Sequence, residues 1–227
     1  MTCARRASSH GCSGGAASHA KKRALDSLAW SAPHPQWNGA TEWPEEVGCV
    51  YYEAADALAL IDPLLPRGGE ESFLAALDRD VARLDRPVAV ILTAPWHKRD
   101  AALIAERYGT TVWAHPAAQA RLPFETQAGP LPDGVEAFSA GGVWEGDVAF
   151  YLRPHRALVV AEFFMGIDGG LRVCPSPAIQ DRGEFERSLQ TLLNWPIDHV
   201  LVGHGEPVIG NGGQRIEQAL RAFAEMR

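Results

Sequence analysis

Short, continuous apolar runs alternate with amphipathic helical segments through the first half of this chain. Val88–Leu92 and Thr111–Ala114 are such runs, typical of strands that are buried on both faces. Residues 70–84 place apolar side chains at helical spacing, and residues 101–108 form a second helical segment that Gly109 can end. This alternation predicts right-handed crossovers onto a mostly parallel sheet.

The second half follows a similar plan. A predicted hairpin over Val47–Asp62 opens the first half, and a hairpin made of Val148–Leu152 and Ala157–Val160 opens the second. A helix over residues 184–194, a strand over His199–Val202 and a C-terminal helix complete the chain. Two halves that each hold a sheet and outer helices predict an α/β (α+β) fold, a four-layer αββα sandwich.

Residues 1–28 differ in composition from the rest of the chain. They hold five Lys and Arg residues against one Asp, are rich in Ser, Gly and Ala, and contain almost no large apolar side chains. Such a segment cannot bury enough surface to offset the entropy of ordering. We therefore expect a disordered basic tail over 1–28 and a single domain over 29–227. The tail has no secretory signal, so the cytoplasm is the default location, although its composition loosely resembles an organelle transit peptide.

Charge and hydropathy narrow the classes of partner. The formal net charge of −7 lacks the electrostatic footprint of a nucleic-acid-binding protein. No stretch approaches 18 consecutive apolar residues, which argues against a membrane-spanning helix. The four cysteines are widely spaced, so a cysteine-framed zinc finger is not expected either. We expect a small-molecule substrate or ligand, with no nucleic acid and no membrane; the oligomeric state stays open.

Four polar side chains with the chemistry of metal ligands come shortly after three of the apolar runs: His97 and Asp100, then Glu162, then His204. In open α/β sheets, ligands bind beyond the carboxyl ends of the strands. Two imidazoles and two carboxylates are a plausible set for one divalent metal, and zinc, iron and manganese all suit them. The residues therefore indicate one divalent metal as the cofactor, or none if the structural explanations below hold.

Each of these residues also has a structural explanation. Asp100 can cap the following helix while His97 lies in solvent. Glu162 can bond backbone N–H groups or an arginine instead of a metal. Glycines on both sides of His204 let the backbone approach a ligand closely, but a Gly-His-Gly turn alone is a weak signal. The residues by themselves leave both explanations open.

At this point the layout resembles the metallo-β-lactamase superfamily over roughly residues 47–223. The resemblance rests on successive landmarks: Leu60-Ile61-Asp62-Pro63, Ile91-Leu92-Thr93, Val148–Leu152, Leu158–Glu162, and Val202-Gly203-His204-Gly205-Glu206-Pro207. It implies the αββα sandwich already predicted, with one or two metal ions that activate a water for hydrolysis.

The metal motif of this chain departs from the one that the resemblance implies. Where Thr-His-x-His-x-Asp-His is expected, Thr93 is followed by Ala94-Pro95-Trp96-His97-Lys98-Arg99-Asp100. A one-residue slip places His97 on the second histidine and Asp100 on the last ligand. Val143 takes the place of a further histidine, and Glu162 replaces a bridging aspartate. Only His204 matches its motif cleanly, so the usual two-metal site cannot be complete.

Two hypotheses follow from this reduced motif. In the first, Asp100, Glu162 and His204, helped by His97, hold one ion that activates water against an ester, thioester or amide. Asp100 and His204 would then be the catalytic residues, and Arg99 or Lys98 would be an anion anchor or oxyanion donor. In the second, the chain is a non-catalytic relative that has lost the metal site and binds a small molecule or a partner protein. The sequence does not identify the substrate.

Overall fold

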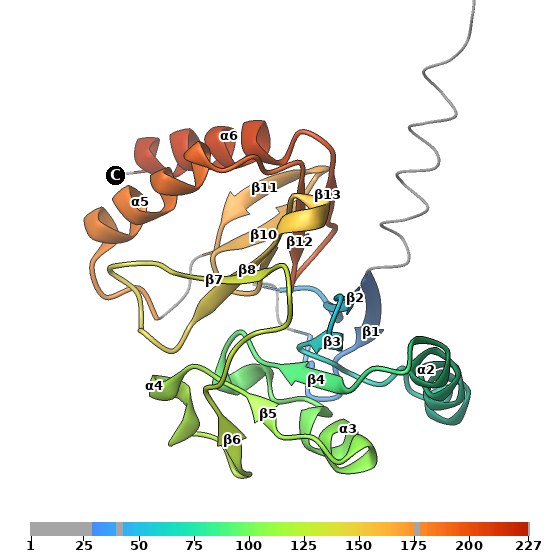
Figure 1. The fold of residues 1–227 in the computed structure, drawn as a ribbon. Coiled ribbons are helices and arrows are strands. Elements are labelled where there is room, and N and C mark those ends of the chain that lie inside the picture. Colours follow the sequence, from blue (N-terminus) through green and yellow to red (C-terminus); the bar gives the residue numbers. More distant parts are fainter. Residues whose placement is uncertain (1–28, 40–42, 175–177, 227) are drawn as a thin grey trace, which may run out of the picture.

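The computed structural model describes residues 29–39, 43–174 and 178–226, so the predicted disorder of residues 1–28 lies outside the described residues. One sheet has six strands in the order β1-β2-β3-β4-β5-β6 (Figure 1). The first three strands are antiparallel, and β3 to β6 run parallel to one another. The strands are β1 (Ala29–Pro33), β2 (Glu46–Glu53), β3 (Leu58–Ile61), β4 (Val88–Ile91), β5 (Val112–Trp113) and β6 (Thr126–Gln127).

The second sheet has five strands in the order β13-β12-β9-β8-β7, and only β12 and β9 pair in parallel. Its strands are β7 (Val135–Ser139), β8 (Val148–Leu152), β9 (Ala157–Val160), β12 (His199–Val202) and β13 (Val208–Ile209). Strands β10 (Phe164–Ile167) and β11 (Gly170–Val173) form a separate two-stranded hairpin. Both sheets are therefore mixed. The predicted parallel pairs lie in the first sheet from β3 onward, and the predicted hairpin of β8 and β9 lies in the second.

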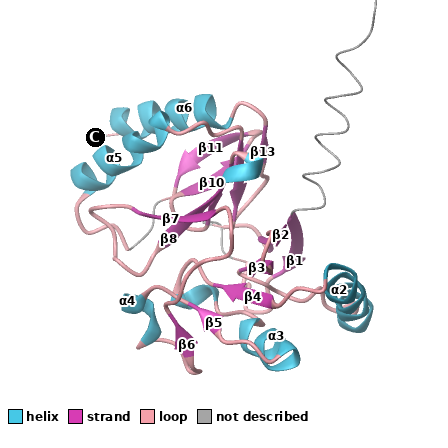
Figure 2. Ribbon diagram, viewed as in Figure 1, coloured by secondary structure: helices cyan, strands magenta, loops and turns pink. Residues whose placement is uncertain are grey.

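The four longest helices lie on the outer sides of the two sheets, with the strands between them (Figure 2). The helix α6 has the clearest amphipathic face, because Ile216, Ala219, Leu220 and Phe223 are buried at helical spacing. None of the helices in the described part of the chain has both the length and the apolar character to cross a membrane. The helices are α2 (Glu70–Leu84), α3 (Ala101–Tyr108), α4 (Pro116–Gln119), α5 (Arg182–Gln190) and α6 (Gly212–Glu225), with short 3-10 turns η1 (Pro95–His97), η2 (Arg153–His155) and η3 (Thr191–Asn194).

Three apolar clusters fill the spaces between successive layers. Strand β3 shows how, because successive side chains of a strand point to opposite faces. Leu58 and Leu60 pack toward the helices α2 and α3, while Ala59 and Ile61 pack toward the second sheet. On that second sheet, Leu158 of β9 faces the helices α5 and α6. This helix–sheet–sheet–helix order confirms the predicted αββα sandwich.

Candidate metal centre

The three central residues of the site each follow the end of a strand. Strands β9 and β12 pair with Val160 opposite Val202, so Glu162 and His204 both lie two residues past the same sheet edge. Strand β4 belongs to the other sheet and leads through Thr93 into η1, whose last residue is His97. The amide of Val148 donates to Thr93 O at 2.9 Å, which joins the two sheets at this point. The site therefore lies where the carboxyl ends of strands from both sheets meet.

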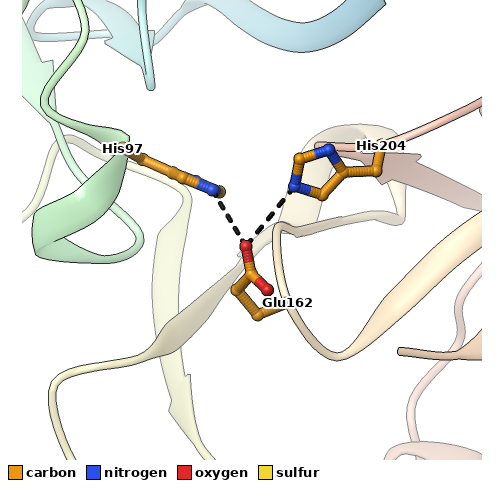
Figure 3. A group of neighbouring side chains, drawn as sticks. All are labelled: His97, Glu162 and His204. Atoms are coloured by element: carbon orange, nitrogen blue, oxygen red, sulfur yellow. Dashed lines mark hydrogen bonds and ion pairs between the residues drawn. The ribbon is translucent and has the colours of Figure 1, made fainter. Parts of the chain in front are cut away.

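The side chains of His97, Glu162 and His204 converge on one point (Figure 3). Glu162 Oε1 is 3.0 Å from His97 Nε2 and 3.4 Å from His204 Nε2. Each residue offers one ligand atom, and the three atoms all lie within 4.8 Å of one another. Two imidazole nitrogens and one carboxylate oxygen at this spacing form a donor set that suits zinc or iron.

Asp62, which follows β3, orients His97 from behind. Its Oδ2 lies 3.0 Å from His97 Nδ1, and its two oxygens accept hydrogen bonds from the amide and the hydroxyl of Thr93. Metal-binding histidines commonly donate their second ring N–H to a carboxylate, which fixes the tautomer and the ring orientation. Sequence reasoning missed this role, although Ile61-Asp62-Pro63 directly after a buried strand was a usable signal.

Charges within this group strongly perturb its titration. Burial opposes a charge on His97, but the carboxylates of Asp62 and Glu162 outweigh burial and raise its pKa to about 9. Burial by itself would raise the pKa of Glu162, yet hydrogen bonds and charge from His204 and His97 hold it well below its ordinary value. Without a metal ion, the group is therefore a compact network of a protonated His97 between two carboxylates.

Asp100 does not join the other three predicted ligands. Its Oδ2 accepts a hydrogen bond from the amide of Leu65 at 2.8 Å, and its own amide donates to Pro63 O. It occupies the N-cap position of α3 but forms no side-chain capping bond there. The carboxylate thus lies beside the loop that follows β3 and stabilises that loop, and it does not point toward the other three side chains. Within the described residues, the group with metal-ligand spacing contains His97, Glu162 and His204 without Asp100.

The apolar residues at the expected metal-ligand positions differ in burial. Ala94 and Val143 are buried, and Val143 is part of the apolar core beneath α5. Trp96 is 41% exposed, and its Nε1 donates to Glu162 Oε1 at 3.2 Å. Its indole therefore lies beside the point on which His97, Glu162 and His204 converge.

A cavity of about 630 Å³ opens over the three convergent side chains. Its lining includes Arg99, whereas the neighbouring Lys98 is exposed and does not line it. Trp43, Trp96 and Trp144 contribute indole surface to the walls. A cavity of this volume can hold a small organic molecule.

Asp147 is a second acid that sequence reasoning missed. It directly precedes β8, and both of its carboxyl oxygens are buried with no hydrogen-bond partner among the described residues. Burial, and then the negative charge of Glu162, raise the pKa of Asp147 well above its ordinary value. The only signal was a charged residue placed directly before the apolar run Val148–Leu152.

Comparisons with known proteins connect this geometry to a fold family. No protein-family model matches the sequence, and no curated protein matches it either. The structure is similar to a metallo-β-lactamase from Pontibacter korlensis, with 16% identity, 87% of this chain and 95% of that chain covered, and a TM-score of 0.62. It is similar to a metallo-β-lactamase family protein from Thermus thermophilus, with 19% identity, 89% and 81% coverage, and a TM-score of 0.55.

A third similar structure was solved in a di-iron-bound form; it shares 22% identity over 76% of this chain and 94% of that chain, with a TM-score of 0.56. The class is therefore defined: this chain has the metallo-β-lactamase fold, and its candidate metal centre lies at strand ends of both sheets. The resemblance seen in the sequence is confirmed at the level of the fold.

Proposed function

We propose that this chain is a hydrolase that uses one divalent metal ion, held by His97, Glu162 and His204, against an ester, thioester or amide. The observation that carries the proposal is the convergence of the two Nε2 atoms and Glu162 Oε1 within 4.8 Å of one another. Three protein ligands are typical of catalytic metal sites, which keep a position open for water. Zinc, iron and manganese are all compatible with this donor set.

The surrounding residues fit such an ion. When bound, the metal would lower the pKa of a water toward neutrality and supply a hydroxide for attack on a carbonyl. Asp62 holds the Nδ1 side of His97 and so directs Nε2 toward Glu162. Trp96 holds Glu162 Oε1 through its indole N–H, which fixes the carboxylate against the cavity wall. These contacts position the ligand atoms before any substrate arrives.

Metal content is the direct test of the ligand set. We expect about one equivalent of metal in the wild-type protein and near-zero content in His204→Ala and Glu162→Gln, measured by elemental analysis. Asp100→Ala is the matched control, because its carboxylate bonds the Leu65 amide and should leave the metal content unchanged. Metal loss in Asp100→Ala would restore Asp100 as a ligand, and a metal-free wild-type protein would overturn the proposal.

Hydrolysis is tested separately with three chromogenic probes: 4-nitrophenyl acetate, a phenyl thioacetate read out with a thiol reagent, and a nitrocefin-type amide. Turnover of at least one probe should disappear on chelation, return on adding zinc, iron or manganese, and be absent in His204→Ala. Turnover that survives both chelation and His204→Ala would show that the metal centre is not responsible.

One observation favours a second candidate, a non-catalytic protein that binds a small molecule. Glu162 Oε1 already lies within hydrogen-bonding distance of the ring nitrogens of His97 and Trp96, with His204 Nε2 at 3.4 Å. Such a network can satisfy its charges without an ion. Absence of metal and of turnover, together with ligand binding in the cavity, would favour this candidate.

A further inference from the structure

The cavity over the candidate metal centre has aromatic walls. Trp43 packs edge-on against His204 with ring centroids 5.4 Å apart, and Trp96 lies 5.5 Å from Trp144 at a tilt of 41°. Arg121 lies over the Trp144 ring, 4.3 Å from its centroid, and is exposed at the surface. Indole faces offer large apolar contact area to a flat group, which they can stack against.

A rigidly held cation lies in the same cavity. Nη1 of Arg99 donates to Gly48 O and to Asp62 O, both at 2.7 Å, and contacts Cys49 Sγ at 3.3 Å. The backbone of Arg99 has φ +36°, a conformation that non-glycine residues rarely adopt. Carbonyl bonds and an unusual backbone therefore hold the guanidinium at the cavity wall.

Among the described residues, no carboxylate forms an ion pair with Arg99, and its buried Nε has no hydrogen-bond partner. The nearby acids are already engaged: Asp62 bonds Thr93 and His97, and Glu162 contacts both histidines. Arg99 therefore has no carboxylate of the described residues within ion-pair distance, although the charge of Asp62 acts on it, and its side chain lines a ligand-sized space. Nη1 is already engaged by two carbonyls and Nε is buried, so Nη2 is the nitrogen through which the charged guanidinium can donate to a carboxylate in the cavity.

We propose that the cavity binds a small organic anion in which a flat apolar group carries a carboxylate, with Arg99 binding the carboxylate and the tryptophans the flat group. The identification of this ligand as a substrate rests on the proposed function. The anchoring role of Arg99 does not, because it needs neither a metal ion nor hydrolysis. Lys98, one residue earlier, is exposed and outside the cavity, so it is a matched control cation.

The test compares 2-naphthoate with 2-naphthamide, which share one ring system and differ in charge. Binding to the full-length protein is followed by tryptophan fluorescence at low salt, first as purified and then after chelation. We expect the wild-type protein to bind naphthoate roughly 10- to 100-fold more tightly than naphthamide, the range for hydrogen bonds to a charged group. Arg99→Gln should abolish this preference without weakening naphthamide binding, and Lys98→Gln should leave it intact.

Naphthamide binding also reports whether Arg99→Gln has folded. If that variant does not fold, the wild-type comparison still decides, because equal affinities for the two ligands overturn the proposal. If the preference for naphthoate disappears on chelation, the metal binds the carboxylate. If the preference falls only in Arg121→Gln, the exposed Arg121 binds it. Either result overturns the role of Arg99. An Arg99-dependent preference in a protein that holds no metal and hydrolyses nothing supports the anchor and rejects the hydrolase.

Discussion

Replacing Asp147 with asparagine should stabilise the protein, and increasingly so as the pH rises. The carboxyl of Asp147 is buried, and neither oxygen has a hydrogen-bond partner among the described residues. Burial, followed by the charge of Glu162, raises its pKa well above the ordinary value of 3.8. Asparagine has nearly the same shape and cannot ionise, so Asp147→Asn removes the titration with little change in packing.

The direction and size of this change in the free energy of unfolding follow from proton linkage. Below pH 3.8 the carboxyl is protonated in both the folded and the unfolded chain, and it contributes no pH dependence. Above that pH the unfolded chain releases the proton while the folded chain retains it. The free energy of unfolding then falls by up to about 1.4 kcal/mol per pH unit until the folded carboxyl itself titrates. At pH 7 we expect Asp147→Asn to be more stable than the wild type by at least about 1 kcal/mol, the value for one pH unit of this linkage.

The measurement is urea unfolding of the chelated wild-type and variant proteins at pH values from 4 to 8. The two stability curves should meet near pH 4 and separate as the pH rises. Asp168→Asn is the control, because Asp168 is exposed and asparagine tolerates its positive φ of 50°. Parallel curves for wild type and Asp147→Asn, or a less stable variant at pH 7, would refute this reasoning.

Three further predictions concern the centre and the core. Asp62→Asn should weaken metal affinity roughly 10- to 100-fold, since His97 loses its charged partner; competition with a chromophoric chelator measures this, and unchanged affinity would contradict it. Gly205→Ala should lower the free energy of unfolding by at least about 1 kcal/mol in urea titrations, because φ is +82° and the new Cβ would lie 2.0 Å from Gly166 O. Phe150→Ala should lower it by about 3–5 kcal/mol in the same assay, since Phe150 is fully buried between the sheets; a loss under about 1 kcal/mol would argue against that packing.

Much of the fold could be predicted from the sequence because its signals are local. The apolar runs of β3, β4, β8, β9 and β12 are almost entirely buried, as continuous apolar strands predict. The amphipathic spacing of α6 likewise matches the face that it buries, and in α2 the apolar residues pack inward although Leu77 is the one that is fully buried. In the second sheet the hairpin of β8 and β9 was predicted, but the parallel pairing of β12 with β9 was not, because its direction depends on contacts far apart in the sequence.

The site was less predictable, because its geometry depends on loops. His97, Glu162 and His204 were found by asking which polar residues follow buried strands, and the structure brings those three together. Asp100 was selected by the same rule together with a helical spacing from His97, but His97 ends the turn η1 while Asp100 precedes α3, so the two do not share one helix face, and Asp100 bonds the Leu65 amide instead. Asp62 also follows a buried strand but was not selected, because an acid before a proline is commonly a turn residue.

The register of the sheets explains how a centre can form without the usual motif. Strands β3 and β4 pair with Ile61 opposite Ile91, so Asp62 and Thr93 leave the sheet at nearly the same level. Asp62 can therefore hold His97 although the two are 35 positions apart in the chain. Glu162 and His204 are brought together in the same way by β9 and β12. The positions of the metal-binding side chains thus depend on which strand ends meet, and the usual motif spacing is not required for them to converge. For that reason metal content, and not motif completeness, decides whether His97, Glu162 and His204 form a metal site.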